Sequence, residues 1–508
     1  MSVAPLHDVE SLSVQDYLDR YAVEQPDKAF LVDVGNGEVA TFSECHQQVC
    51  RIANTIGQMG VKPGDPVAYA FGNSKDSALV ILALLYGGYL ATAVNLVAGE
   101  STIEYVLEHS EAKLVIADED AAELLKPILA AAASVPLISR SAVLEKAKTA
   151  STAVQSVSAL ADGLLMYTSG TTGRPKGVVH TQSSLLAGGR NTAEAHGLQA
   201  DDRGLCVLPF YHINAFCVSL MGSLVSGSSI VIPSRFSVKS FWDQIRQHKC
   251  SWFSVVPTQI SYLLHNAENA GGDATGCTKL RFGRSASAPL SPEMHEAFEA
   301  RFGVPVIETM GLTETAAQIL SNPLPPATRK IGSPGVAFGN EVIIGDSNQN
   351  EVTSGEEGEI LVRGGNVLSR YLKNPEATAE AITKSGWLRT GDLGRMDEDG
   401  YVFVTGRLKE LIIKGGENIA PREVDEALYC HEDVMEAAAF PVPCKDYGQR
   451  VEAAVKLNET SNATEQELLA LCMDKLGKFK SPDRIHILED LPKGPSGKIQ
   501  RIKLIELI

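Results

Sequence analysis

The stretch from Leu164 to His180, LLMYTSGTTGRPKGVVH, constrains this chain more strongly than any other part of its sequence. Apolar residues 164–167 predict a buried strand, and the paired valines at 178–179 predict a second strand rather than a helix. The segment between them is rich in hydroxyls and glycines, and it consists of Thr168, Ser169, Gly170, Thr171, Thr172 and Gly173. Glycine tolerates the positive φ with which a loop can direct several N–H groups at one anion. We interpret the loop as a phosphate clamp with Lys176 at its rim, the alternative being an ordinary solvent loop.

Two common nucleotide-binding patterns do not match this stretch. The P-loop requires G-x-x-x-x-G-K-[ST] at the start of a helix, but the fifth residue after Gly170 is Pro175. No G-x-G-x-x-G sequence follows a predicted strand, so dinucleotide binding is not supported. The expected phosphate site is therefore a flexible loop between two strands.

From Tyr167 to Gly177 the sequence YTSGTTGRPKG closely resembles the signature of the adenylate-forming superfamily. That superfamily contains beetle luciferases, the adenylation domains of peptide synthetases, and acyl-CoA ligases such as oxalyl-CoA synthetase and 4-coumarate–CoA ligase. The resemblance implies an α/β and α+β fold with two domains. Stacked α/β subdomains would form a large N-terminal domain over residues 1–407, and a small mobile α+β domain would follow over residues 408–508, with a hinge at Lys409. It also implies Mg²⁺, ATP and CoA, with a carboxylic acid as the group that is activated.

Length and composition agree with that class. A chain of 508 residues needs two or more folding units. The formal charge of −17 argues against nucleic acid or an anionic membrane as the main partner. Nine cysteines without a CxxC pair indicate neither a zinc site nor a disulfide framework, so we expect a reducing cytoplasm. The oligomeric state is left open by the sequence, with a homodimer as one option.

Helical and strand-like segments alternate before residue 118. Helical spacing occurs at 14–21, 42–59, 78–86 and 101–108, and strand-like runs occur at 67–71, 91–94 and 113–117. This alternation predicts a mostly parallel sheet covered by helices. The apolar run 78–94 is interrupted by Gly87 and Gly88, which favours a buried helix followed by a buried strand over a membrane span. The predicted elements of the small domain are helices at 424–428 and 465–476 and strands at 436–440 and 452–457.

Two further segments match superfamily blocks that surround adenine and the phosphates. The segment SASAPL contains Ser287 and lies where relatives place adenine, which small residues allow to approach the backbone. In TMGLTET the resemblance assigns Thr309 and Met310 to the base, Thr313 to the α-phosphate and Glu314 to magnesium, which prefers hard oxygen ligands. Met310 replaces the tyrosine that usually stacks on adenine, and its thioether can still cover the base.

The ribose is expected to contact two residues further along the chain. Asp392, in the segment WLRTGDL, would accept hydrogen bonds from the two ribose hydroxyls because an ionised carboxylate only accepts. Standing alone, this Gly-Asp pair would predict no more than a turn. Arg407, in GRLKEL, would contact the ribose or a phosphate.

The acyl pocket is expected around His212, in the segment LPFYHINAF. A histidine among aromatic and apolar residues is more often a core residue than a catalytic one. In acyl-CoA synthetases, however, an aromatic–histidine pair lies where the carboxylate meets the α-phosphate, so the resemblance makes His212 catalytic. Amino-acid-activating relatives usually have aspartate here. The histidine therefore favours an acid without an α-amino group.

Three other residues bear on the identity of the acid. Arg284 stands where a small or apolar residue is expected, and it would either hold a second carboxylate of the substrate or simply face water. The resemblance also places Ala316 and Gln318 against the acid. The continuation QILSNPLP from Gln318 is similar to the oxalyl-CoA synthetase branch. A small polar or dicarboxylic acid is therefore expected.

The C-terminal segment LPKGPSGKIQR contains Lys498, which the resemblance identifies as the catalytic lysine. The alternative for a lysine near a chain end is a flexible basic tail. Gly415 and Gly416 match a loop that walls the pantetheine tunnel, where a side chain would block the thiol. The expected enzyme forms acyl-AMP and pyrophosphate and then acyl-CoA and AMP. The alternatives are an enzyme that loads a carrier protein and a non-catalytic nucleotide-binding protein on this fold.

Overall fold

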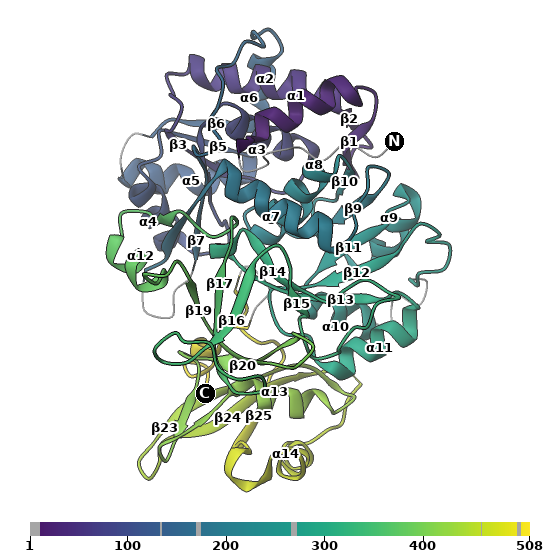
Figure 1. Ribbon diagram of the computed structural model, residues 1–508, viewed down its shortest axis with the longest axis vertical. Helices are drawn as coiled ribbons and strands as arrows, with labels where there is room; N and C mark the ends of the chain where they lie inside the picture. Colours follow the sequence, from purple (N-terminus) through teal and green to yellow (C-terminus); the bar gives the residue numbers. More distant parts are fainter. Residues whose placement is uncertain (1–10, 133–134, 169–173, 266–271, 459, 495–498) are drawn as a thin grey trace.

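Four β-sheets organise the part of the chain that the structure, a computed structural model, describes: residues 11–132, 135–168, 174–265, 272–458, 460–494 and 499–508. Two large sheets and their helices make up the upper part of the molecule, coloured purple to teal (Figure 1). A four-stranded sheet follows, and a smaller five-stranded unit coloured yellow-green lies at the opposite end (Figure 1).

The seven-stranded sheet has the order β18-β8-β7-β4-β3-β5-β6. Its strands are β3 (Pro66–Ala70), β4 (Leu90–Ala93), β5 (Leu114–Ala117), β6 (Leu137–Ser139), β7 (Asp162–Thr168), β8 (Lys176–Thr181) and β18 (Arg370–Tyr371). Neighbours from β7 to β6 run parallel, as the alternation of helices and strands predicts. The last two strands, β8 and β18, are antiparallel to their neighbours. Its helices are α3 (Lys75–Tyr86), α4 (Glu100–Ser110), α5 (Glu119–Ala132) and α6 (Arg140–Ala147).

The nine-stranded sheet has the order β15-β14-β13-β12-β11-β9-β10-β1-β2. Its strands are β1 (Ala29–Asp33), β2 (Val39–Thr41), β9 (Arg203–Cys206), β10 (Ser229–Ile232), β11 (Trp252–Val255), β12 (Phe282–Ser285), β13 (Val306–Leu312), β14 (Ala317–Ser321) and β15 (Val336–Ala337). The helices on it are α1 (Val14–Glu24), α2 (Phe42–Gln58), α7 (Gln182–Ala195), α8 (Gly222–Ser226), α9 (Phe241–His248), α10 (Pro257–His265) and α11 (Pro292–Phe302). Shorter turns of helix are the π-helix η2 (Asn214–Met221) and the 3₁₀ helices η3 (Val238–Ser240) and η5 (Thr313–Thr315).

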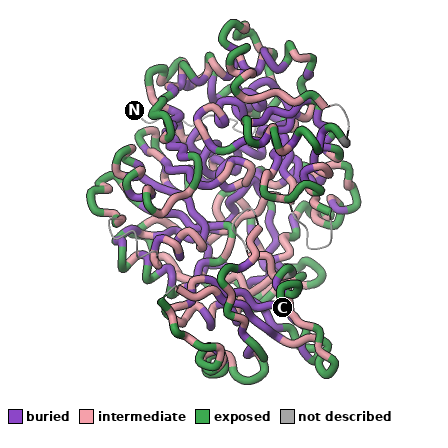
Figure 2. Tube along the Cα trace, turned by 180° about the vertical axis from the view of Figure 1, so that it is seen from behind, coloured by how far each residue is buried: buried purple, intermediate pink, exposed green. Residues whose placement is uncertain are grey.

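The apolar run at 78–94 is explained by the position of α3 between the two large sheets. This helix contacts β1 on one side and β4 and β7 on the other, and every residue from Ala78 to Tyr86 is buried. A helix that is apolar all round is buried on all sides. The purple interior of the large part in Figure 2 follows from the same layering. Among the described residues, no helix combines the length and the apolar character that crossing a bilayer would require.

The two remaining sheets are mainly antiparallel and belong to the C-terminal third of the chain. The four-stranded sheet contains β16 (Glu341–Gly345), β17 (Gly358–Arg363), β19 (Leu388–Met396) and β20 (Val402–Arg407), with α12 (Pro375–Ala381) beside it. The five-stranded sheet contains β21 (Ile412–Lys414), β22 (Glu417–Ile419), β23 (Val434–Cys444), β24 (Gly448–Leu457) and β25 (Arg484–Ile487). Its helices are α13 (Pro421–Tyr429), α14 (Glu465–Lys480) and α15 (Arg501–Leu504), and α13 and α14 enclose a separate apolar core with the sheet.

The predicted helices and strands are confirmed with shifts of a few residues at their ends. Helix α3 begins at Lys75 rather than Ala78 because the Ser74 side chain accepts a hydrogen bond from the Ser77 N–H and caps the helix. Gly88 has a φ of +72° and turns the chain into β4. In the small unit, β23 and β24 are longer than predicted, since they pair along their whole length.

Candidate active site

Two cavities collect most of the residues that the sequence singled out. The larger, of about 560 Å³, lies between the β7–β8 hairpin and the turn after β20, and the predicted residues that line it are Thr168, Lys176, His212, Ser287, Thr313, Glu314, Arg407 and Lys409. The smaller, of about 210 Å³, lies where the small unit meets the rest of the molecule, and its predicted residues are Ser287, Thr309, Met310, Asp392 and Arg407. Ser287 and Arg407 border both spaces, so segments far apart in sequence form one continuous site.

The structure describes both flanks of the predicted phosphate clamp. Residues Ser169 to Gly173 lie outside the described part of the chain. Thr168 at the end of β7 pairs with Lys176 at the start of β8, so the clamp joins two antiparallel strands as predicted. The Lys176 ammonium lies 5.0 Å from the centre of the Tyr371 ring, a cation–π distance.

The predicted catalytic Lys498 also lies outside the described residues, but its neighbours are placed. Lys493 and Ile499 form an antiparallel bridge, and Ile499 lines the smaller cavity. Lys493 is held by an ion pair of 2.9 Å to the buried Glu436, and Tyr262 on α10 donates a hydrogen bond of 3.1 Å to the same carboxylate. The start of this C-terminal segment is therefore tied to the large part of the molecule beside the nucleotide residues.

Glu314 is held in place from three directions. Its backbone lies in η5, and its carbonyl accepts a hydrogen bond of 2.7 Å from the Leu368 N–H. The Tyr371 hydroxyl donates a hydrogen bond of 3.0 Å to Oε1. Burial raises the pKa of Glu314, which the hydrogen bond from Tyr371 and the charge of Arg407 oppose.

A magnesium ion bound with ATP fits this donor set. Mg²⁺ is usually held by one or two carboxylates together with phosphate oxygens. The Glu314 carboxylate borders the larger cavity beside Lys176, where phosphates are expected. In the described part of the chain no three metal-ligating side chains gather in one place. An ion at Glu314 would therefore take most of its ligands from the nucleotide.

Asp392 and Arg407, the two residues assigned to ribose, face each other across a strand pair. They are register partners on β19 and β20, and Arg407 Nε donates a hydrogen bond of 2.6 Å to Asp392 Oδ1. Burial alone would lower the pKa of Arg407, but the charge of Asp392 outweighs it and raises the pKa. Arg407 is therefore ionised. The carboxylate retains lone pairs for further donors, since each carboxylate oxygen can accept more than one hydrogen bond.

Sequence reasoning missed Glu308, which borders the smaller cavity next to Thr309 and Met310. This glutamate is 2% exposed, and its Oε1 accepts a hydrogen bond of 3.2 Å from the Leu290 N–H. Its Oε2 has no hydrogen-bond partner among the described residues. The available signal was an acidic residue inside an apolar strand, because a buried carboxylate needs partners.

The segment that carries His212 is braced by the residues before α3. The Asn73 side chain donates a hydrogen bond of 2.7 Å to the Leu208 carbonyl and accepts one of 3.0 Å from the Phe210 N–H. Tyr69 donates a hydrogen bond of 3.0 Å to the Phe210 carbonyl. Asn73 and Tyr69 are buried, so these three bonds fix the backbone that leads to His212.

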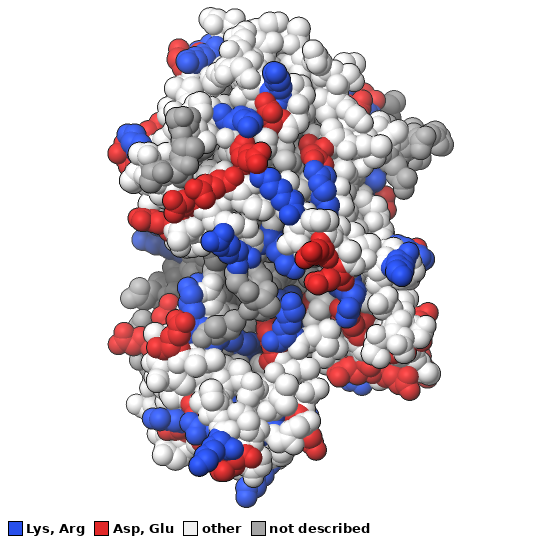
Figure 3. Space-filling view, turned by 90° about the vertical axis from the view of Figure 1, so that its left-hand side faces the viewer, with Lys and Arg blue, Asp and Glu red and all other residues white. Residues whose placement is uncertain are grey.

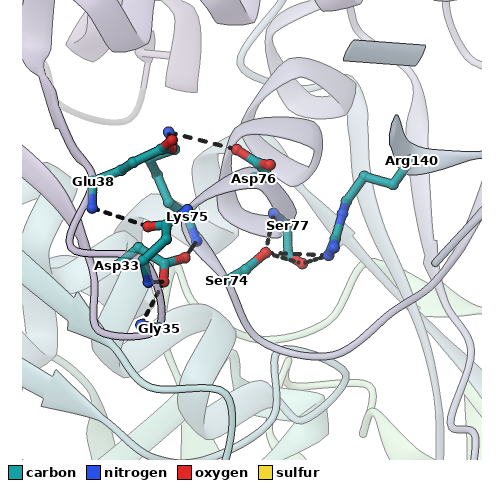
Figure 4. Close-up of polar contacts among 9 residues, drawn as sticks. Asp33, Gly35, Glu38, Ser74, Lys75, Asp76, Ser77 and Arg140 are labelled. Carbon is teal, nitrogen blue, oxygen red and sulfur yellow. Dashed lines mark hydrogen bonds and ion pairs between the residues drawn. The ribbon is translucent and has the colours of Figure 1, made fainter. Parts of the chain in front are cut away.

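A polar cluster anchors the start of α3 in turn (Figure 4). The Lys75 N–H donates a hydrogen bond of 2.8 Å to Asp33 on β1, and the Lys75 ammonium pairs with Glu38. Arg140 on α6 donates hydrogen bonds to Ser74 at 3.1 Å and to Ser77 at 2.6 Å. The residues that hold the His212 segment are therefore anchored by contacts to elements of both large sheets.

Arg284 is 1% exposed. It does not line the larger cavity itself but contacts a residue that does. Its guanidinium donates hydrogen bonds to Asn214 at 3.3 Å, to Ser254 at 3.2 Å and to Gln318 at 3.4 Å. Asn214 lines the cavity, and sequence reasoning missed it. The water-facing alternative for Arg284 is therefore wrong, and Asn214 stands between the guanidinium and the cavity.

No carboxylate compensates the charge of Arg284 within the described residues. Its three hydrogen-bond acceptors are neutral, and its Nε has no hydrogen-bond partner there. Burial lowers the pKa of Arg284 from its usual range to about 9. Ala316, in the left-handed region with a φ of 43°, is buried close by on the same segment as Gln318. The polar groups behind the acyl cavity thus form a cationic site with free hydrogen-bonding capacity.

The predicted hinge and pantetheine residues lie on either side of β21. Lys409 is exposed in the turn where the chain passes from the four-stranded to the five-stranded sheet. Gly415 and Gly416 have φ values of +61° and +89° and form the two-residue β21–β22 turn, which favours glycine. Neither glycine lines the two cavities described above. A contact between this turn and the cavities would require the small unit to change its orientation.

If Lys409 is the hinge that the sequence predicts, Lys409→Pro should leave adenylate formation within about twofold of the unaltered enzyme and lower thioester formation roughly 100-fold, because a fixed φ stiffens the turn. The two half-reactions can be measured separately, as pyrophosphate release and as conversion of synthetic acyl-AMP to acyl-CoA. Lys409→Ala is the control, since it removes the charge and leaves φ free. Normal CoA ligation by the proline variant would exclude a hinge at Lys409.

Family models match both parts of the chain. Residues 18–372 match the AMP-binding enzyme family, and residues 423–498 match the AMP-binding enzyme C-terminal domain. These matches contain the clamp, Thr313, Glu314 and Lys498. The chain belongs to the AMP-binding enzyme family, and the predicted membership of the adenylate-forming superfamily is confirmed.

Relatives that align over nearly their whole length define the class of enzyme more closely. The chain is 42% identical to the sulfoacetate–CoA ligase of Cupriavidus necator, covering 95% of this chain and 96% of that protein. It is 35% identical to the oxalate–CoA ligase of Arabidopsis thaliana, covering 97% and 98%. The crystal structure of ATP-bound MatB from Rhodopseudomonas palustris superposes with a TM-score of 0.90 at 27% identity, covering 98% of this chain and 99% of that one. The predicted fold class is confirmed, and the enzyme is an acid–thiol ligase.

Proposed function

We propose that this chain is an ATP-dependent acid–CoA ligase whose substrate is a small carboxylic acid carrying a second anionic group. The observation that carries the choice of acid is Arg284, a buried cation without a carboxylate partner among the described residues. Burying an unpaired charge costs several kcal/mol, which an anion at the end of the acyl cavity would offset. The names of the two relatives point the same way, since sulfoacetate and oxalate each carry two acidic groups.

The first step joins the acid to the nucleotide. A carboxylate oxygen of the acid attacks the α-phosphorus of ATP, and the bond to the β-phosphate oxygen breaks to release pyrophosphate. Two unit charges about 4 Å apart repel by about 4 kcal/mol at a surface-like dielectric, so the site must supply positive charge. Lys176, Lys498 and the N–H groups of the clamp supply it in this proposal, where charge develops at the α-phosphate. Magnesium held by Glu314 would neutralise further phosphate charge when bound.

The second step transfers the acyl group to sulfur. The CoA thiol loses its proton and attacks the acyl carbon, and AMP leaves as the carbon–oxygen bond breaks. The thiol needs a path that Lys498 does not block, so rotation at Lys409 would withdraw Lys498 and bring Gly415 and Gly416 to the site. Figure 3 shows that acidic and basic side chains alternate in small groups over one face of the molecule, so the net charge of −17 is not gathered into one field there that would repel anionic CoA.

The test is product formation with a panel of acids. Purified protein, Mg-ATP and CoA are incubated with oxalate, malonate, succinate or sulfoacetate, and with acetate as the singly charged control. Mass spectrometry should detect the acyl-CoA product in the reaction with at least one doubly charged acid, and at most a trace of acetyl-CoA in the reaction with acetate. AMP release that depends on a carrier protein and not on free CoA would favour the carrier-loading alternative.

Two remaining expectations are part of the same proposal. We place the enzyme in the cytoplasm because its nine cysteines are free thiols in the structure and no disulfide joins them among the described residues. The homodimer expected as one option would be tested by light scattering of the purified protein. A mass close to 54.3 kDa would exclude it.

A further inference from the structure

His180 is a fully buried histidine on β8 that the reaction described above does not use. Its side chain is 0% exposed. Its Nε2 lies 2.6 Å from the Thr313 carbonyl oxygen, and its Nδ1 lies 3.1 Å from Ser184 Oγ. His180 and Thr313 are 133 residues apart in sequence, so this contact joins the phosphate-clamp hairpin directly to the turn that holds the α-phosphate and metal residues.

The partners fix which ring nitrogen carries the proton. A carbonyl oxygen only accepts, so Nε2 must be protonated and donate to Thr313. Burial lowers the pKa of His180 to about 4, so the ring is neutral near pH 7. Nδ1 is then an acceptor for the Ser184 hydroxyl, whose oxygen lies 3.1 Å from both Nδ1 and the Thr181 carbonyl oxygen. The ring is held in one tautomer by contacts on both sides, which is typical of histidines that orient a functional group.

The face of β8 that carries His180 contacts the Thr313–Glu314 turn directly at Thr313 and indirectly, through Tyr371, at Glu314. Side chains alternate along a strand, so Lys176, Val178 and His180 share one face. Lys176 lies against the Tyr371 ring, and Val178 is the register partner of Tyr371. Tyr371 in turn donates to Glu314 Oε1. One face of a single strand therefore fixes Thr313 through its carbonyl and Glu314 through its carboxylate.

We propose that His180 is a positioning residue for adenylate formation, in which its Nε2–H donates to the Thr313 carbonyl and holds the Thr313–Glu314 turn in register with strand β8. The inference rests on the proposed function for the roles of Thr313 and Glu314. Groups that orient the residues around a metal commonly change metal affinity or activity by 10-fold to 100-fold when removed, so an effect of about that size is expected.

The experiment compares two replacements of similar size in the full-length enzyme. His180→Leu removes the donor, whereas His180→Gln keeps an N–H donor on a side chain of similar reach. H180L should lower the kcat of acid-dependent pyrophosphate–ATP exchange and raise the Mg²⁺ concentration for half-maximal rate, each by about 10-fold to about 100-fold. H180Q should restore both values to within about threefold. The KM for the acid and the rate of thioester formation from synthetic acyl-AMP should change by less than about twofold in either variant.

A binding measurement separates this inference from the proposed function. Calorimetry with Mg²⁺ and α,β-methylene-ATP needs no turnover and no knowledge of the acid, and H180L should weaken binding while H180Q does not. If the unaltered enzyme shows no acid-dependent exchange, the proposed function fails while calorimetry still tests His180. If H180L does not fold, Ser184→Ala serves instead, because it removes the contact at Nδ1 that orients the ring and should lower kcat in the same direction.

Val179→Ala is the matched control. Val179 is buried on the opposite face of β8, so its truncation should lower the melting temperature without changing the Mg²⁺ dependence. Equal losses in H180L and H180Q, or an H180L effect on melting temperature alone, would overturn the inference. A shift of the Mg²⁺ dependence in V179A as large as that in H180L would overturn it as well.

Discussion

Lys498→Ala should lower acid-dependent adenylate formation by on the order of 10³-fold, the range over which cationic groups act on phosphoryl transfer. Thioester formation from synthetic acyl-AMP should change by less than about threefold. The reason is electrostatic, because a carboxylate must approach a polyanion in the first step, and in the proposed mechanism Lys498 offsets the charge that develops at the α-phosphate. In the second step the attacked atom is the acyl carbon, which does not require that cation.

The two half-reactions of K498A are measured separately with the acid identified by the panel. Lys503→Ala is a suitable control, since Lys503 is an exposed lysine on the neighbouring helix α15. The bridge between Lys493 and Ile499, together with the position of Ile499 in the smaller cavity, puts the flanks of Lys498 beside the nucleotide residues. Equal loss of both half-reactions in K498A would contradict its assignment.

Arg284→Met should raise the KM for the doubly charged acid about 10-fold, because it removes the buried cation that attracts the second anion from behind Asn214. The same variant should keep or raise the melting temperature, since it replaces a buried, uncompensated cation by an apolar side chain of similar length. The opposite signs of the two effects distinguish an anion-binding residue from a residue that only supports the fold. Circular dichroism and steady-state kinetics on one preparation give both numbers.

Singly charged acids provide the internal control for R284M. A monocarboxylate has no second anion for Arg284 to bind, so replacing the arginine should change the rate with such an acid by less than about threefold. Arg284→Lys retains the charge but loses the planar set of donors that reaches Asn214, Ser254 and Gln318. The KM of this variant for the doubly charged acid should therefore fall between that of the unaltered enzyme and that of R284M. A uniform loss with all acids, accompanied by a lower melting temperature, would contradict a role in recognising the second anion.

The fold could be read largely from local patterns. The spacing of apolar residues predicted α3 and β4 from the run 78–94, and the paired valines predicted β8, because the identity of an element is encoded within a few turns of chain. The exact start of α3 was missed because it depends on the cap at Ser74. These are differences of boundary and not of architecture.

Site residues could be predicted from the sequence only where they lie in segments that match superfamily motifs. The clamp, Thr313 and Glu314 stand in matched segments, so their convergence was expected. The surroundings of Arg284 could not be predicted, since Asn214, Ser254 and Gln318 approach it from other elements across 70, 30 and 34 residues of sequence. His180 ends the clamp motif, and its sequence context gives no sign of its contact with Thr313 for the same reason. Long-range contacts of single polar side chains leave no periodic signal in the sequence.

The central claim is that the clamp at residues 168–173 and Lys498 act together on the α-phosphorus of ATP while an acid attacks it. Its most direct test is the exchange of labelled pyrophosphate into ATP by the purified full-length protein, with Mg²⁺ present and CoA omitted. We expect exchange that depends on a small acid with a second anionic group and that is lost in K498A. The absence of exchange with every acid of the panel, or exchange that continues without acid, would contradict it.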